Sequence, residues 1–170
     1  AFGFVGIITT ILIQYVSNYG QKLDLHKQRF ETSIFEQIRL IRETREEIIF
    51  IDPISKIKFT GREATRQVEK YLRNAIIEYE KKAEKIAITQ KRREARYTRG
   101  FHSRFEGRVG AIFRVVYYTF DKIRSDKFLT DEEKRNYGNL IRGQLTSADA
   151  AVLGVNALTE YSKDLSEIVI

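Results

Sequence analysis

Residues 1–30 read AFGFVGIITTILIQYVSNYGQKLDLHKQRF. The first 21 of them decide the fold, because no charged residue occurs before Lys22. Twenty-one helical residues at about 1.5 Å each span about 30 Å, which is the thickness of the hydrocarbon core of a bilayer. We therefore expect residues 1–21 to form a transmembrane helix and residues 22–170 to form a helical domain.

The charges that flank this segment predict its orientation. They follow the apolar run and do not precede it, and no small-residue cleavage site comes after it, so the pattern favours a retained anchor over a signal peptide. Tyr15 and Tyr19 stand where an aromatic belt would mark the inner interface. By the positive-inside rule, we expect residues 22–170 to lie on the cytoplasmic side of the membrane and the N-terminus to face outward. The flanking basic residues are Lys22, Lys27, Arg29, Arg39 and Arg42.

A polar stripe runs along the same segment. Thr10, Gln14, Ser17 and Gln21 recur at steps of three and four and share one face of a helix. An amide alone in lipid would be unsatisfied, which is costly. The stripe has three interpretations: polar contacts between close-packed helices, the wall of a water-filled pore, or one face of a helix buried in a soluble protein. The first two require self-association, and a pore requires a ring of copies.

Composition narrows the chemistry. The 170 residues hold 30 Lys and Arg against 23 Asp and Glu, a net charge of +7 that favours anionic partners such as nucleic acid or a membrane surface. Cysteine is absent, which excludes disulfides and thiolate metal sites. With two histidines and no glycine-rich phosphate loop, we expect no metal site and no cofactor. Methionine is absent even at position 1, which predicts that residues precede Ala1.

The remaining chain has the pattern of helices. Apolar spacing near 3.6 predicts that the first helix continues to about Phe50 and ends at Asp52-Pro53, with a short extended segment over about 54–59. Capping boxes at Thr60, Ser103 and Thr130 predict helices over about 62–96, 103–125 and 130–143, and a last helix over about 147–163. The fold class is all-α, a helical bundle whose first helix extends through the membrane.

Arg96 and His102 form a candidate catalytic pair with five residues between them. This spacing resembles that of HEPN-type ribonucleases, so the domain is expected to be HEPN-like. In such a site the histidine would move protons during attack by the RNA 2′-hydroxyl, and the arginine would stabilise phosphate charge without a metal. Two other interpretations stay open: His102 is a loop residue before the Ser103 cap, or the pair is a structural or ligand-sensing remnant.

The pair lies in a basic cluster with aromatic residues between the charges. Such surfaces hold single-stranded RNA through phosphate contacts and stacking, and they also suit anionic partner proteins. The simpler interpretation is a solvated helix face. The candidate binding residues are Lys91, Arg92, Arg93, Arg99, Arg104 and Arg108, interleaved with Tyr97, Phe101 and Phe105.

Two resemblances follow from these motifs. The opening AFGFVGIITTILIQYVSNYG and RYTRGFH, residues 96–102, resemble the small Csx-type accessory membrane proteins of type VI-B CRISPR systems, which accompany an RNA-guided RNA-cleaving effector. FETSIFEQIRL, GREA, FRVVYYTFDKI and YGNLIRGQLTSADAAVL resemble phage abortive-infection proteins. The resemblances imply antiviral defence at the inner membrane, by a pore that depolarises it.

We therefore expect a non-enzymatic, homo-oligomeric inner-membrane pore, lined by the polar stripe, that enhances RNA-targeting CRISPR interference. Its expected partners are further copies of itself, the lipid bilayer, the RNA-guided effector and RNA. Two alternatives are a membrane-tethered HEPN-type ribonuclease using Arg96 and His102, and a membrane-anchored adaptor that binds RNA or the effector through the basic cluster.

Overall fold

The structure, a computed structural model, describes residues 2–83 and 90–157. These ranges contain five helices and one short antiparallel hairpin, so the expected all-α fold is confirmed apart from the hairpin. The elements in chain order are α1 (Phe2–Glu46), β1 (Ile49–Ile51), β2 (Lys58–Thr60), α2 (Gly61–Ala83), α3 (Gln90–Ser125), α4 (Asp131–Arg142) and α5 (Ser147–Ala157).

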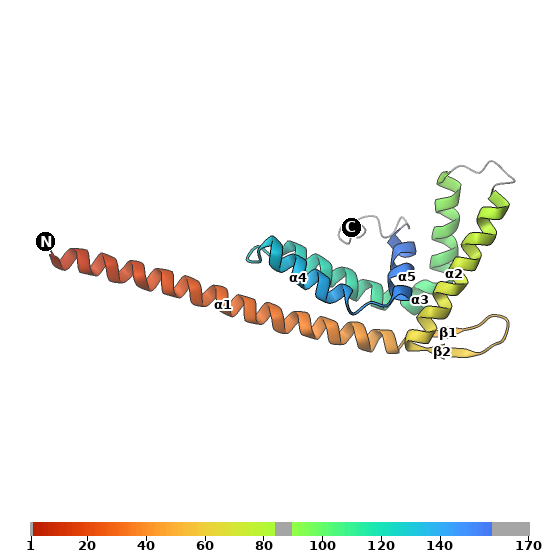
Figure 1. The fold of residues 1–170 in the computed structure, drawn as a ribbon, viewed down its shortest axis with the longest axis horizontal. Helices are drawn as coiled ribbons and strands as arrows, with labels where there is room; N and C mark the ends of the chain where they lie inside the picture. The colour runs from red at the N-terminus through yellow and green to blue at the C-terminus, as the bar shows by residue number, and fades with distance from the viewer. Residues whose placement is uncertain (1, 84–89, 158–170) are drawn as a thin grey trace.

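The first helix has two parts with different surroundings. Its C-terminal half packs mainly on α3, and its N-terminal part projects beyond the other helices (Figure 1). Phe30, Ile34, Ile38 and Ile41 are buried at steps of three and four, which is the apolar stripe of a helix that packs on one side. The body and the projecting part thus belong to one continuous helix of 45 residues.

The hairpin replaces the predicted end of the first helix. We expected α1 to reach about Phe50 and to stop at Asp52-Pro53, but α1 ends at Glu46 and Phe50 lies in β1. The run from Ile48 to Ile51 is rich in β-branched residues, which favour strands over helices. Pro53 therefore lies in the hairpin loop and does not end the helix.

The hairpin closes over one end of the core. Phe50 and Phe59 face each other in the strand register, with ring centroids 6.5 Å apart, and the ring of Tyr71 on α2 lies 6.4 Å from that of Phe50. Asp52 Oδ1 fixes the loop by accepting hydrogen bonds from the backbone of Ile54 at 2.7 Å and Ser55 at 2.9 Å. These hydrogen bonds hold the pKa of Asp52 below its usual value.

The middle of the chain divides at a different place from the one predicted. The second helix starts at Gly61, close to the predicted start, but it ends at Ala83 and not near Arg96. The third helix runs unbroken from Gln90, so Ser103 lies inside it and is not a cap. A Ser-x-x-Glu pattern is compatible with a helix interior, and no proline falls within residues 90–125 to stop the helix. The predicted end at Ser125 is confirmed.

The predicted boundaries of the fourth helix are confirmed in atomic detail. The Thr130 side chain accepts a hydrogen bond from the backbone of Glu133, and the Glu133 side chain accepts one from the backbone of Thr130. Gly143 forms the C-terminal cap. The last helix starts at Ser147 as expected, whereas its predicted extension to Lys163 falls outside the described residues.

A buried ion pair joins the two ends of the core. Arg45 near the end of α1 and Asp149 in the first turn of α5 are 3.0 Å apart, and their side chains are 1% and 2% exposed. Arg45 also donates to the carbonyl of Gln144 at 2.7 Å, and Asp149 accepts from the backbone of Thr146 at 2.8 Å. The pair therefore fixes where α5 begins relative to α1.

Breaking this pair should destabilise the fold strongly. Arg45→Met leaves the Asp149 carboxylate buried without its counter-charge, so we expect a loss of about 3–5 kcal/mol in the free energy of unfolding, measured by urea denaturation. The matched control is Arg39→Met, which removes an arginine whose side chain is 68% exposed and should cost about 1 kcal/mol or less. Equal, small losses in the two variants would contradict the assigned role.

Candidate functional site in the projecting end of α1

The projecting part of α1 carries a long run of exposed apolar side chains. The exposed fraction is 72% for Phe4, 64% for Ile13 and 68% for Val16. Contiguous exposed apolar surface of this extent marks a place where another molecule binds. The exposed apolar residues of this part, called the apolar segment below, are Phe4, Ile7, Ile8, Ile11, Leu12, Ile13, Tyr15, Val16 and Tyr19.

We expected residues 1–21 to cross a bilayer as one helix. Residues 2–21 are helical, but within residues 2–83 and 90–157 no helix has the length and apolar character needed to span a membrane.

The polar stripe lies on one side of the apolar segment. Its four residues are all exposed, and at about 100° per residue they fall within about 60° of one another around the helix axis. Thr10 Oγ1 donates to the carbonyl of Gly6 at 2.9 Å, so this hydroxyl is satisfied by the helix itself. The side chains of Gln14 and Gln21 are exposed, and neither makes such a bond to another described residue.

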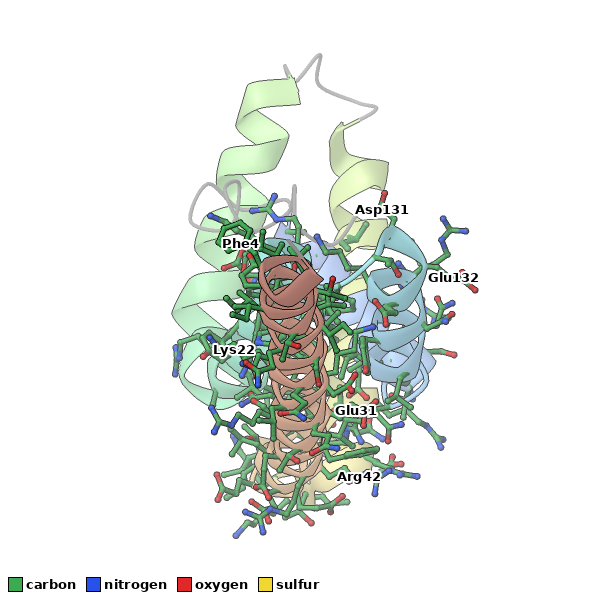
Figure 2. The ribbon with its side chains drawn as sticks, turned by 90° about the vertical axis from the view of Figure 1, so that its left-hand side faces the viewer. Phe4, Lys22, Glu31, Arg42, Asp131 and Glu132 are labelled. Carbon is green, nitrogen blue, oxygen red and sulfur yellow. The ribbon has the colours of Figure 1, made fainter. Side chains whose placement is uncertain are left out.

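The stripe faces away from the body. The buried residues Phe30, Ile34, Ile38 and Ile41 are centred roughly 135° around the axis from the stripe. Figure 2 looks along α1 from its N-terminus, with Phe4 at the near end and with α4, which carries Asp131 and Glu132, to one side of α1. The four residues of the stripe are exposed, and they do not lie on the face of α1 that the body covers.

A cluster of polar contacts holds α1 against the body at the point where its N-terminal part begins to project. This cluster, called the clamp below, consists of the contacts His26–Asp126, Lys27–Glu133 and Glu31–Tyr137. His26 Nε2 and Asp126 Oδ2 are 2.8 Å apart, and the His26 ring lies 4.6 Å from that of Phe128. Asp126 Oδ1 accepts from the backbone of Phe128 at 2.8 Å and of Leu129 at 3.1 Å. One carboxylate thus shapes the turn between α3 and α4 and holds that turn against α1.

Two further contacts complete the clamp. Lys27 Nζ donates to Glu133 Oε1 at 2.6 Å, and the Tyr137 hydroxyl donates to Glu31 Oε1 at 3.1 Å. Glu133 also caps α4, so the start of α4 and its attachment to α1 depend on the same carboxylate. The clamp joins residues 26–31 of α1 to the turn and the first two turns of α4.

The electrostatics of the clamp follow from these contacts. The hydrogen bond from Lys27, together with those from Thr130, lowers the pKa of Glu133 to about 2, and the same bond raises the pKa of Lys27. Partial burial raises the pKa of Asp126, but hydrogen bonds from Phe128, His26 and Leu129 outweigh it, so the pKa lies below its usual value. Burial and the bond to Glu31 raise the pKa of Tyr137 to about 12.

Sequence reasoning did not identify the clamp or the Arg45–Asp149 pair. Their partners are about 100 residues apart in sequence, and a single sequence holds no signal for such pairings. One local signal was available for Asp149: Thr146-x-x-Asp149 is a capping box pattern, and Thr146 and Asp149 do form its two hydrogen bonds.

The predicted catalytic and binding residues lie between Lys91 and Arg108 of α3. Arg96 and His102 both fall inside this helix, so the interpretation of His102 as a loop residue is wrong. Positions six residues apart on one helix lie about 120° apart around its axis, so the pair does not share one face. The rest of the basic cluster lies on the same helical stretch, and the side chains of all these residues fall outside the described part of the structure.

Metal ligands do not gather in the described part of the chain. Within residues 2–83 and 90–157, no group of three or more His, Cys, Asp or Glu side chains is arranged to hold a metal ion.

Comparison with known proteins gives one match. Residues 104–170 match the model of a family described as "Putative phage abortive infection protein". The match begins within α3 and includes α4 and α5, so it contains the side of the clamp formed by Asp126 and Glu133 and the Asp149 side of the buried ion pair. No curated protein and no solved structure matches the chain. The resemblance to abortive-infection proteins is therefore confirmed for this part of the chain.

The clamp predicts a dependence of stability on pH. Because the pKa of Glu133 falls from 4.5 to about 2 on folding, its contribution is complete above pH 4.5 and is lost as the pH falls toward 2. Glu133→Gln should flatten the decline of the unfolding free energy across this interval, measured by urea denaturation at several pH values. Glu132→Gln, on the exposed side of the same helix turn, is the control. If the unfolding free energy of both variants falls with pH as steeply as that of the unmodified protein, Glu133 is not the source of the pH dependence.

Proposed function

We propose that this protein acts in antiviral defence as a homo-oligomer in the bacterial inner membrane, with the apolar segment against lipid and the polar stripe around a water-filled pore. The observation that carries the proposal is the projecting end of α1, where exposed apolar side chains cover most of the circumference and four polar residues, Thr10, Gln14, Ser17 and Gln21, share one side. Residues 22–170 would then form the cytoplasmic domain.

Lipid is the partner that best fits the apolar segment. The first 21 residues carry no charge, and basic residues begin at Lys22, where they can reach lipid phosphates at the inner interface. A soluble partner would need an apolar groove that surrounds a helix on most of its sides. A bilayer surrounds it without any specific groove.

The polar stripe explains why the assembly requires several copies. A single helix with this stripe exposes amides to hydrocarbon, and this cost opposes insertion of one chain alone. In a ring of copies each stripe turns inward to water, and the side chains that face lipid are mostly apolar, with Thr9 and Asn18 the polar residues outside the stripe. The body does not obstruct this arrangement, because it packs on the opposite side of α1.

The biological setting is supported by resemblance. The match to an abortive-infection family over residues 104–170 supports a role in defence against phage. Enhancement of an RNA-guided CRISPR effector is supported by the resemblance of the N-terminal segment and of residues 96–102 to Csx-type accessory proteins, and it extends the proposal to that effector as a functional partner.

The experiment is ion flux from proteoliposomes made with the purified protein. Gln14→Leu should leave the protein bound to the liposomes and lower the flux several-fold, because it removes a wetted amide from the stripe. The matched control, Leu12→Gln, lies on the lipid side and should weaken liposome association in a flotation assay. Liposomes that show neither association nor flux with the unmodified protein would overturn the proposal.

The pore requires no nuclease chemistry, which gives a second prediction. Arg96→Ala and His102→Ala should retain the flux of the unmodified protein in the same liposomes. RNA cleavage by the purified protein, abolished by either variant, would instead support the ribonuclease. Loss of salt-sensitive RNA binding on replacing Arg92 and Arg93 would support the adaptor.

A further inference from the structure

The polar stripe does not stop where the apolar segment ends. Because α1 is unbroken to Glu46, positions beyond residue 21 can be placed on the same side of the helix. Consider a line along the surface of α1 that is parallel to the helix axis and passes through Thr10. At about 100° per residue, Asp24, Gln28 and Phe35 fall within about 40° of this line. All three are exposed, so this line stays open along the part of α1 that packs on the body.

Asp24 is the charged residue on this line between Thr10 and Phe35. The neighbouring basic residues Lys22, Lys27 and Arg29 lie at least about 90° away around the axis, and Lys27 is bonded to Glu133. Glu31, at the edge of the line, accepts from Tyr137. In a ring of copies, the charge that faces the centre at this level is therefore negative.

Phe35 is an apolar residue on an otherwise polar line. Its side chain is 62% exposed, whereas the preceding residue, Ile34, lies on the buried face of α1 and is 1% exposed. The core of the body therefore does not use the Phe35 ring. Around a ring of copies, large apolar side chains at one level form a constriction that resists wetting. Beyond it, Arg39 is 2.9 Å from Glu36 and 3.6 Å from Glu43, so its charge is balanced locally.

We infer that the conduit continues below the membrane along this side of α1, with Asp24 forming a ring that favours cations and Phe35 forming an apolar constriction. This inference rests on the proposed pore, and it adds the class of ion, a cation, and the position of the narrowest point.

The first test measures the ion selectivity of proteoliposomes under a KCl gradient. We expect the unmodified protein to pass K⁺ in preference to Cl⁻, and Asp24→Asn to reduce this preference several-fold with flux retained. Glu132 is an exposed acidic residue on α4 (Figure 2). The variant Glu132→Gln is therefore the matched control and should keep the preference for K⁺. A pore whose selectivity is the same in Asp24→Asn would overturn the role of Asp24 and leave the pore itself intact.

The second test uses the absence of cysteine from the chain, so that any single cysteine is the sole target of a thiol reagent. A charged methanethiosulfonate reagent should change the flux through Phe35→Cys at least several-fold. It should not change the flux through Tyr118→Cys, which replaces an aromatic residue of similar exposure, 59%, on α3. Equal responses of the two variants would overturn the constriction, and no flux from the unmodified protein would instead overturn the proposed function.

Discussion

The continuity of α1 is the constraint on which the rest of the structure depends. Each backbone N–H of a helix bonds to the carbonyl four residues earlier, so an unbroken helix fixes the direction of every side chain relative to every other. The burial of Phe30, Ile34 and Ile41 in the core therefore determines which way Gln14 and Ser17 point, although these two residues lie more than about three turns before the core. A kink between the body and the projecting end would remove this relation.

Two sets of polar contacts keep α1 in this position. The Arg45–Asp149 pair holds its C-terminal end to α5, and the clamp holds residues 26–31 to the turn before α4 and to α4 itself. The Arg45–Asp149 pair is buried, and such a pair adds little net stability but penalises any arrangement that separates its charges, which makes it suited to fixing orientation. The part of the chain that resembles abortive-infection proteins supplies one side of both contacts.

The sequence predicted the local features of the fold better than the long-range ones. The helix Asp131–Arg142, capped by Thr130 and Gly143, was predicted correctly because its capping box and terminal glycine act within a few residues. Ser103 carries the same pattern and is not a cap, because the pattern alone does not begin a helix and no proline interrupts α3 around it. The polar stripe was visible as a periodicity, whereas its direction relative to the body required the position of the core. The clamp depends on pairings between distant segments, for which a single sequence holds no signal.

The most direct measurement of the central claim is the environment of single spin labels along α1 in liposomes, since the chain has no cysteine of its own. Labels at positions 10, 14, 17 and 21 should be accessible to a water-soluble nickel reagent, and labels at 8, 12 and 16 should be accessible to oxygen in lipid. The accessibility should alternate with a period of about 3.6 residues. Accessibility without this period, or labels at 8, 12 and 16 open to the nickel reagent, would contradict the account.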